Sequence, residues 1–365
     1  MRITEPTLLL DKERCLRNIG AMSQKAKKHG LLFRPHFKTH QSRIIGRWFR
    51  DFGISAITVS SLKMAGYFAD DGWNDITVAF PVNVLEIERI NYLAEKIHLN
   101  LLVESAKTAS LLDHNLLHQV GVYMKIDAGY HRTGIPAERS EEIEGLVNAI
   151  DSAAHLRFLG FIAHAGHTYR AGSPGEIVAI HDSTRAVMAE LKERFVDDHP
   201  EILTSIGDTP GCSLAEEFTG IDEIRPGNFV FYDAMQVALG SCEASRVAVA
   251  MACPVVAQHA DRNEMIIYGG AVHFSQDSIS LNGSRSFGTV VPLEGTSWGS
   301  PIGGGFISSL SQEHGVVSAT TEVMRSHPAG SLIGILPIHS CLTADCMKGY
   351  YSPSEGFIDH MSRKL

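Results

Sequence analysis

The chain has 365 residues, 44% of them hydrophobic, and a formal net charge of −9 at pH 7, which allows one large α/β barrel with a small domain or several ordinary domains. The acidic balance and the lack of a basic block exclude nucleic acid and anionic membrane surfaces as expected partners. The six cysteines follow no framework spacing and no apolar run approaches membrane-spanning length, so we expect a cytoplasmic protein with free thiols.

The first predicted elements are a strand over residues 6–11 and an amphipathic helix over residues 12–29, with Asp11 placed to cap that helix. From there strand-like and helix-like runs alternate along the chain. Further strands are predicted at 31–35, 55–60, 75–80, 98–104, 121–127, 157–164, 202–206 and about 221–231. Further helices are predicted at 41–51, 61–70, 85–95, 105–115, 138–153, 175–195 and 213–219.

Eight strand-then-helix units in succession predict a parallel (β/α)8 barrel of the TIM type, whose sites lie where the strands end. A doubly wound open sheet would give much the same pattern, so the periodicity alone leaves the closure open. After about residue 240 the apolar runs become short and are separated by Gly, Pro, Asn and Ser, which is typical of antiparallel β structure. We therefore expect a domain boundary near residues 240–247.

A lysine follows the first predicted barrel strand, in the stretch Arg34-Pro-His-Phe-Lys38-Thr-His40. Burial at the end of a strand disfavours an ammonium ion and lowers its pKa, which suits an amine that forms a Schiff base. A lone lysine in such a place is more often paired with an acid or extended to the surface. Its interpretation therefore depends on the rest of the chain.

The stretch Arg-Pro-His-x-Lys-Thr-His resembles the pyridoxal-phosphate lysine segment of the D-serine dehydratase and D-threonine aldolase family, fold-type III enzymes related to alanine racemase. The resemblance extends from about Pro6 to Asp345. It implies pyridoxal 5'-phosphate bound covalently to Lys38, on a (β/α)8 barrel over residues 12–242. It also implies a mainly antiparallel β domain made of residues 1–11 and 243–365, and a homodimer.

Two further segments after predicted strands match the same family. Arg132 ends the run Lys125-Ile-Asp-Ala-Gly-Tyr-His-Arg132, and the resemblance gives it a hydrogen bond to the phenolic oxygen of the cofactor. His164 and Tyr169 fit a His-x-Gly-x-x-Tyr pattern and would lie beside the cofactor. Without the family, His164 and His167 would be an ordinary hydrogen-bonding pair. Tyr169 stands where the aldolases are expected to carry a histidine base, which favours the dehydratase branch.

Glycine-containing turns follow the seventh and eighth predicted strands. TIM barrels often hold a phosphate there, on backbone N–H groups and a helix N-terminus. One such turn would be weak support, but two at these positions predict a phosphate site. The residues predicted to bind the cofactor in these turns are Thr209, Gly211, Gly227 and Asn228. Arg225, in Arg-Pro-Gly, resembles the racemase arginine that faces the pyridine nitrogen, and an uncharged pyridine is a weaker electron sink.

The second strong motif is Pro337-Ile-His339-Ser-Cys341-Leu-Thr343. Residues i and i+2 of a strand face the same side, so His339 and Cys341 are predicted to bind one metal ion. Imidazole with thiolate suits zinc, although such a pair alone is more often packed in a core. The motif resembles the zinc-binding segment of D-serine dehydratases, which implies Zn2+ or another divalent metal. Asp345 is a weaker candidate ligand.

The predicted function is β-elimination from a D-β-hydroxy amino acid, such as D-serine or 3-hydroxy-D-aspartate, to a 2-oxo acid and ammonia, with pyridoxal phosphate and zinc. Lys38 takes the α-proton and the metal accepts the β-hydroxyl. Retro-aldol cleavage of D-threonine or 3-hydroxy-D-aspartate to glycine and an aldehyde uses the same parts. A racemase needs no metal, and a non-catalytic pyridoxal-phosphate carrier resembles the barrel alone, so both are less favoured.

Overall fold

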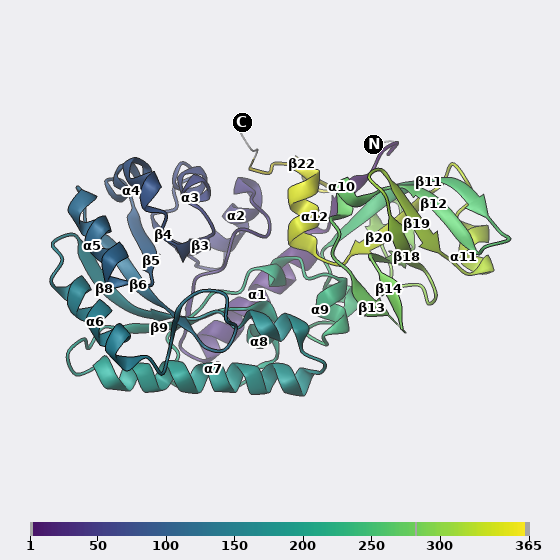
Figure 1. The fold of residues 1–365 in the computed structure, drawn as a ribbon. Coiled ribbons are helices and arrows are strands. Elements are labelled where there is room, and N and C mark those ends of the chain that lie inside the picture. Colours follow the sequence, from purple (N-terminus) through teal and green to yellow (C-terminus); the bar gives the residue numbers. More distant parts are fainter. Residues whose placement is uncertain (1–2, 282, 362–365) are drawn as a thin grey trace. The chain divides into compact units, whose positions relative to one another are not determined.

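The computed structural model describes residues 3–281 and 283–361 (Figure 1). Its contacts divide the chain into two compact units. The first unit consists of Ala21–Lys38 and Phe49–Gly227, and the second of the described parts of Met1–Gly20, Thr39–Trp48 and Asn228–Leu365. The domain boundary near residues 240–247 stays a prediction.

The first unit contains a parallel strand ring, in the order β2-β10-β9-β8-β6-β5-β4-β3. Its strands are β2 Leu32–Phe33, β3 Ala56–Val59, β4 Asp75–Pro81, β5 His98–Val103, β6 Val120–Asp127, β8 Leu156–Ile162, β9 Leu203–Ile206 and β10 Glu223–Ile224, and the short β7, Ile135–Pro136, pairs with β6.

The ring closes just beyond β2, where His36 bridges Thr58 of β3 in parallel. The Thr58 amide donates to the Pro35 carbonyl at 2.9 Å, and the Phe37 amide donates to the Thr58 carbonyl at 2.8 Å. The predicted barrel is thereby confirmed over the doubly wound alternative.

Helices connect the barrel strands, and their ends follow from local sequence signals. They are α1 Lys12–Lys28, α2 Arg43–Arg50, α3 Leu62–Ala69, α4 Ile87–Ala94, α5 Ala106–Asn115, α6 Ser140–Asp151, α7 Pro174–Phe195 and α8 Thr209–Leu214. The hydroxyls of Ser61, Ser105 and Ser173 cap α3, α5 and α7. As predicted, Asp11 caps α1, because its carboxylate accepts from the Arg14 amide at 2.9 Å. None of the described helices is long and apolar enough to cross a membrane.

The second unit is built on an antiparallel sheet, as the sequence predicted. The strand order is β12-β19-β18-β15-β20-β11-β1-β21-β22, and an additional β12–β11 pairing closes its first part into a ring. The strands are β1 Thr7–Leu10, β11 Val249–His259, β12 Glu264–Tyr268, β15 Gly288–Val291, β18 Phe306–Leu310, β19 His314–Ser318, β20 Leu332–Pro337, β21 Tyr350–Ser352 and β22 Gly356–Ile358. β1 pairs with β11, so the start of the chain completes this sheet.

Candidate active site

Lys38 lies in the turn that follows the closing bridge of the barrel. Phe37, next to it, is fully buried, and its ring lies 4.9, 5.0 and 5.1 Å from the rings of Phe49, Phe68 and Trp73. The Lys38 side chain itself is exposed, so its predicted burial is wrong. The cause is that β2 ends at Phe33, well before this residue, and Lys38 lies in a turn after the bridge at His36. The buried ring of Phe37 therefore fixes the chain directly before the exposed side chain of Lys38.

Burial of a lysine is found instead at Lys125 on β6. Its side chain is buried, and its Nζ donates to the Ile126 carbonyl at 2.7 Å. The pKa of Lys125 is lowered to about 7, chiefly by desolvation and then by the positive charges of Arg225 and Arg132, against the opposing effect of nearby carboxylates. The sequence reasoning quoted this residue in a motif without recognising its environment, because burial in a barrel core depends on strands far away in sequence.

His164 follows β8, and its Nδ1 contacts the carbonyl oxygen of Gly207. The pKa of His164 is lowered to about 3, chiefly by desolvation and also by the charges of Lys38, Arg132 and Arg225, while the Gly207 contact acts in the opposite direction. The imidazole is therefore neutral near pH 7. Because all three cations act on this ring, the structure gathers the predicted residues Lys38, Arg132 and Arg225 around His164.

The loop after β6 presents Arg132, and Asp127 organises this loop. The Asp127 carboxylate accepts from the amides of Gly129 and His131, at 3.1 and 2.9 Å, and pairs with the His131 ring at 2.9 Å. A carboxylate that accepts several backbone hydrogen bonds folds a loop back on the end of its own strand. Arg132 is thus held on a structured turn.

Tyr130 is a site residue that the sequence reasoning missed. Its ring lies 4.9 Å from the Arg132 guanidinium and 5.8 and 6.1 Å from the rings of His164 and His167. A Cβ on Gly166 would meet the Tyr130 ring at 2.5 Å, so the glycine of the His-x-Gly pattern makes room for this ring. A tyrosine two residues before a predicted arginine carries no pattern of its own.

Tyr169 and Thr209, predicted from separate strands, lie together, since the Thr209 amide donates to the Tyr169 hydroxyl oxygen at 3.2 Å. Asp208 caps α8, and its Oδ1 accepts from the Gly211 amide at 2.6 Å and from the Thr168 hydroxyl at 2.9 Å. Burial raises the pKa of Asp208 to about 6. The predicted helix at 213–219 is wrong, because this cap starts the helix at Thr209. The Gly211 amide is engaged by the cap.

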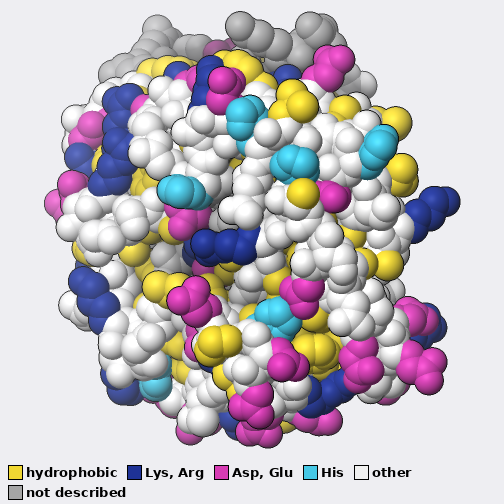
Figure 2. Space-filling model, turned by 90° about the vertical axis from the view of Figure 1, so that its left-hand side faces the viewer, with side chains coloured by type: hydrophobic (Ala, Val, Ile, Leu, Met, Phe, Trp, Pro, Cys, Tyr) yellow, Lys and Arg dark blue, Asp and Glu magenta, His cyan; other side chains and the backbone are white. Residues whose placement is uncertain are grey.

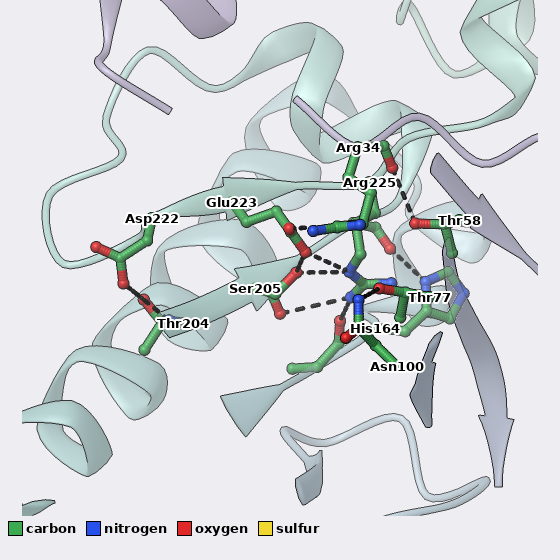
Figure 3. A network of polar contacts seen from close by, with 12 residues as sticks. Arg34, Thr58, Thr77, Asn100, His164, Thr204, Ser205, Asp222, Glu223 and Arg225 are labelled. Atoms are coloured by element: carbon green, nitrogen blue, oxygen red, sulfur yellow. Dashed lines mark hydrogen bonds and ion pairs between the residues drawn. The ribbon is translucent and has the colours of Figure 1, made fainter. Parts of the chain in front are cut away.

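Arg225 follows β10 and is buried in the barrel (Figure 3). Its Nε donates to the Ser205 hydroxyl at 2.7 Å and its Nη2 to the Ala163 carbonyl at 2.6 Å. Gly227 ends the first unit. Asn228 belongs to the second unit, where its Nδ2 donates to Asp233 at 2.6 Å.

A cavity of about 740 Å³ lies at the other end of the barrel, where the strands begin. Its lining includes Arg34, Asp75, Asn100 and Tyr123, and none of the predicted site residues. The volume alone therefore does not mark the site, which lies at the carboxyl ends of the strands as expected for this fold.

In the second unit, His339 and Cys341 do not lie on a strand, and that prediction is wrong. β20 ends at Pro337, His339 is the residue before α12, Ser340–Met347, and Cys341 lies in its first turn. The Asp233 carboxylate accepts from the Ser340 amide at 3.0 Å and so fixes the start of this helix. The two side chains still meet, because Cys341 hydrogen-bonds to His339.

The surroundings of this pair suit a metal site with two protein ligands. Asp277 lies 3.3 Å from His339 Nδ1, as a carboxylate often does behind a metal-binding histidine, which leaves Nε2 for the ion. The Cys341 sulfur contacts the Thr39 hydroxyl at 3.2 Å and Asn228 Nδ2 at 3.6 Å. Within residues 3–281 and 283–361, no group of three or more His, Cys, Asp or Glu is arranged to hold a metal. Asp345, the weaker candidate ligand, forms an ion pair with Lys348 at 2.8 Å.

Two family models match the chain. "Alanine racemase, N-terminal domain" matches residues 10–234, and "Putative serine dehydratase domain" matches residues 248–352. The first match covers more than half of the chain, so the chain belongs to the alanine racemase N-terminal domain family. The match to the serine dehydratase domain follows it along the chain. It is an enzyme, a lyase that depends on pyridoxal phosphate.

Similar proteins carry the names of both reactions. D-threo-3-hydroxyaspartate dehydratase from Delftia sp. (strain HT23) is 28% identical, over 96% of this chain and 94% of that protein. D-serine dehydratase from Dictyostelium discoideum is 28% identical, over 92% and 89%. 3-Hydroxy-D-aspartate aldolase from Paracoccus denitrificans (strain Pd 1222) is 27% identical, over 67% and 65%.

The solved structure of the Delftia dehydratase has a TM-score of 0.91 and 26% identity, over 99% of this chain and 98% of that one. Two variants of it have also been solved, one with a histidine and one with a cysteine replaced by alanine. The cysteine variant is described as the metal-free form. The replaced residues are two positions apart, which is the spacing of His339 and Cys341.

Proposed function

We propose that the protein catalyses the β-elimination of a D-β-hydroxy amino acid, such as D-serine or 3-hydroxy-D-aspartate, to a 2-oxo acid and ammonia. We propose zinc, or another divalent metal, as a second cofactor beside pyridoxal phosphate. The observation that carries the proposal is that one unit of the chain has a cationic barrel mouth containing Lys38, and the other unit has His339 and Cys341 in contact with each other. The names of the similar dehydratases support it.

The residues at the barrel mouth fit pyridoxal phosphate, because an accessible amine and two guanidinium groups surround a neutral imidazole. Lys38 would form the Schiff base, Arg132 would bind the phenolic oxygen, and Arg225 would face the pyridine nitrogen. The other residues proposed to hold the ring or the phosphate are His164, Tyr169, Thr209, Gly211, Gly227 and Asn228. When bound, the cofactor supplies an electron sink for the charge that develops on the substrate α-carbon.

Lys38 is the proposed base that takes the α-proton, and its side chain is exposed, so a substrate can reach the amine. His164 does not compete for the proton, because a pKa near 3 makes it a poor base. Arg132 and Arg225 keep the mouth positive, which favours binding of the substrate carboxylate.

In the second unit, imidazole and thiolate donors favour zinc among the common divalent metals. A metal held by His339 and Cys341 would supply Lewis acidity toward the β-hydroxyl of the substrate. Asp277 orients the imidazole by accepting from Nδ1, and Asn228 holds the sulfur by donating to it.

Retro-aldol cleavage to glycine and an aldehyde is the second candidate, favoured by the similarity to a 3-hydroxy-D-aspartate aldolase. The test is to incubate the purified enzyme with D-serine, D-threonine and 3-hydroxy-D-aspartate, with and without a chelator. Keto acid and ammonia, lost on chelation, are expected from a metal-dependent dehydratase. Glycine and aldehyde would move the protein to the aldolase branch.

The role of Lys38 is tested by Lys38→Ala, which should lose both the lyase activity and the visible absorbance of the bound cofactor. Lys27→Ala is the matched control, because Lys27 is an exposed lysine on α1 that belongs to none of the predicted motifs. Full lyase activity in Lys38→Ala would contradict the proposed mechanism.

We also propose a cytoplasmic homodimer without nucleic-acid or membrane partners. On the face shown in Figure 2, acidic and basic side chains are interspersed, and the net charge of −9 disfavours polyanions as partners. Light scattering on the purified protein tests the dimer, and a monomer as the active species would contradict it.

A further inference from the structure

Five side chains inside the barrel are joined end to end, and we name them the barrel network: Asp75, Arg34, Glu223, Ser205 and Arg225. Figure 3 labels the last four. Arg34 donates from Nη1 and Nη2 to Asp75, at 2.6 and 3.1 Å, and from Nε to Glu223 Oε2, at 2.6 Å. The Ser205 hydroxyl donates to Glu223 Oε1 at 2.6 Å and accepts from Arg225 Nε at 2.7 Å.

Glu223 is the centre of the barrel network. It is 0% exposed, between Arg34 and Arg225, which are 6% and 5% exposed. Each of its two carboxylate oxygens serves one side, directly toward Arg34 and through Ser205 toward Arg225. A buried charge is tolerated only where its partners are well placed, so the position of each guanidinium is set by this carboxylate.

Two nitrogens of Arg225 are held within the protein, Nε by Ser205 and Nη2 by the carbonyl of Ala163, the residue before His164. Among the residues that the structure describes, none accepts a hydrogen bond from Nη1. Arg225 also lowers the pKa of His164, which places its charge at the cofactor end of the barrel. Nη1 is thus the atom of Arg225 that remains for a ligand.

We infer that Glu223, acting through Ser205, is a positioning residue that fixes the guanidinium of Arg225 for the cofactor. The inference rests on the proposed function, which assigns the cofactor to this barrel mouth. Glu223 also offsets the charge of Arg225, so it limits the positive potential at the mouth. A protonated Schiff base is favoured when that potential is low.

The same two strands offer a matched control. Alternate residues of a strand face opposite sides, and the residues next to Ser205 and Glu223 are Thr204 and Asp222. Asp222 accepts from the Thr204 amide at 2.8 Å and pairs with Lys192 of α7 at 2.6 Å. Figure 3 shows this pair apart from Arg225. Asp222→Asn therefore removes a carboxylate just before β10 without touching the barrel network.

The experiment measures two properties of the full chain, the Kd for pyridoxal phosphate and the pH midpoint of the bound-cofactor absorbance. Ser205→Ala should weaken cofactor binding by about tenfold, because it removes a hydrogen bond to a charged group. Ser205→Thr, which keeps the hydroxyl, should restore the affinity. Glu223→Gln should shift the midpoint to lower pH, because the negative charge that offsets Arg225 is lost and the potential at the mouth becomes more positive. Asp222→Asn should change neither property.

The inference is overturned if Ser205→Ala and Glu223→Gln match the wild type or Asp222→Asn in both properties. Thermal unfolding of each variant separates a loss of folding from a loss of positioning. Where Glu223→Gln does not fold, Ser205→Ala decides, because it leaves every charge in place. A wild-type chain that binds no pyridoxal phosphate would instead overturn the proposed function itself.

Discussion

Replacing Phe37 by alanine should destabilise the barrel and loosen the Lys38 turn in one step. Phe37 is 0% exposed and packs against three aromatic rings within 5.1 Å. Truncation of a buried phenylalanine costs about 3–5 kcal/mol, and the three ring pairs place Phe37 at the upper end of that range. We therefore expect the free energy of unfolding to fall by about 5 kcal/mol, and by less for Phe37→Leu, which keeps a large apolar side chain but loses the ring pairs.

Urea unfolding of the cofactor-free protein measures this loss, and fluorescence titration measures the affinity for pyridoxal phosphate. Phe195→Ala is the control, because Phe195 on α7 is 8% exposed and packs against Phe161 at 5.5 Å. It should lose stability with little change in affinity, whereas Phe37→Ala should lose both. A Phe37→Ala protein that loses less than about 1 kcal/mol, or that matches Phe195→Ala in affinity, would refute the anchoring argument.

Three further predictions concern Asp208 at the start of α8, the neighbouring Gly207, and the proposed metal ligands His339 and Cys341. The folded state raises the pKa of Asp208 from 3.8 to about 6, so it binds this proton more tightly than the unfolded chain does. Stability from this group is full below about pH 4 and falls by about 3 kcal/mol as the pH rises to about 6; Asp208→Asn should flatten that fall in urea titrations at several pH values. A Cβ on Gly207 would lie 2.9 Å from backbone atoms beyond β10, so Gly207→Ala should lower the free energy of unfolding by about 1–3 kcal/mol. Gly145→Ala, on a helix with nothing within 4 Å, should not lower it. His339→Ala and Cys341→Ala should each lower the bound metal measured by elemental analysis, and a full metal content in both would place the metal elsewhere.

Most of the barrel could be predicted, because its strands and helices carry their own periodic patterns and caps. The helix predicted at 213–219 was wrong although Asp208 and Pro210 are a recognisable start signal. The glycine after them was interpreted as part of a phosphate-binding turn, and that interpretation displaced the helix. The competing signal was local and available.

The error at Cys341 has a different cause, which is contact between distant segments. The strand before His339 was expected to continue, and it stops where Asp233 binds the Ser340 amide. Glu223 and Ser205 were missed for the same reason, since buried polar partners on neighbouring strands leave no motif. Sequence patterns identify the residues that meet a cofactor more readily than the residues that hold them.

The part of the barrel wall formed by β2 and β10 is where local unfolding should be easiest. β2 and β10 have only two residues each, whereas the other strands of the ring have four or more. Few backbone hydrogen bonds therefore hold this part of the wall, and local opening is cheapest where such bonds are few. Lys38 and Arg225 follow these two strands. A ligand bound by both Lys38 and Arg225 would hold these two short strands together. Much of the stability gained on cofactor binding should therefore be gained at β2 and β10.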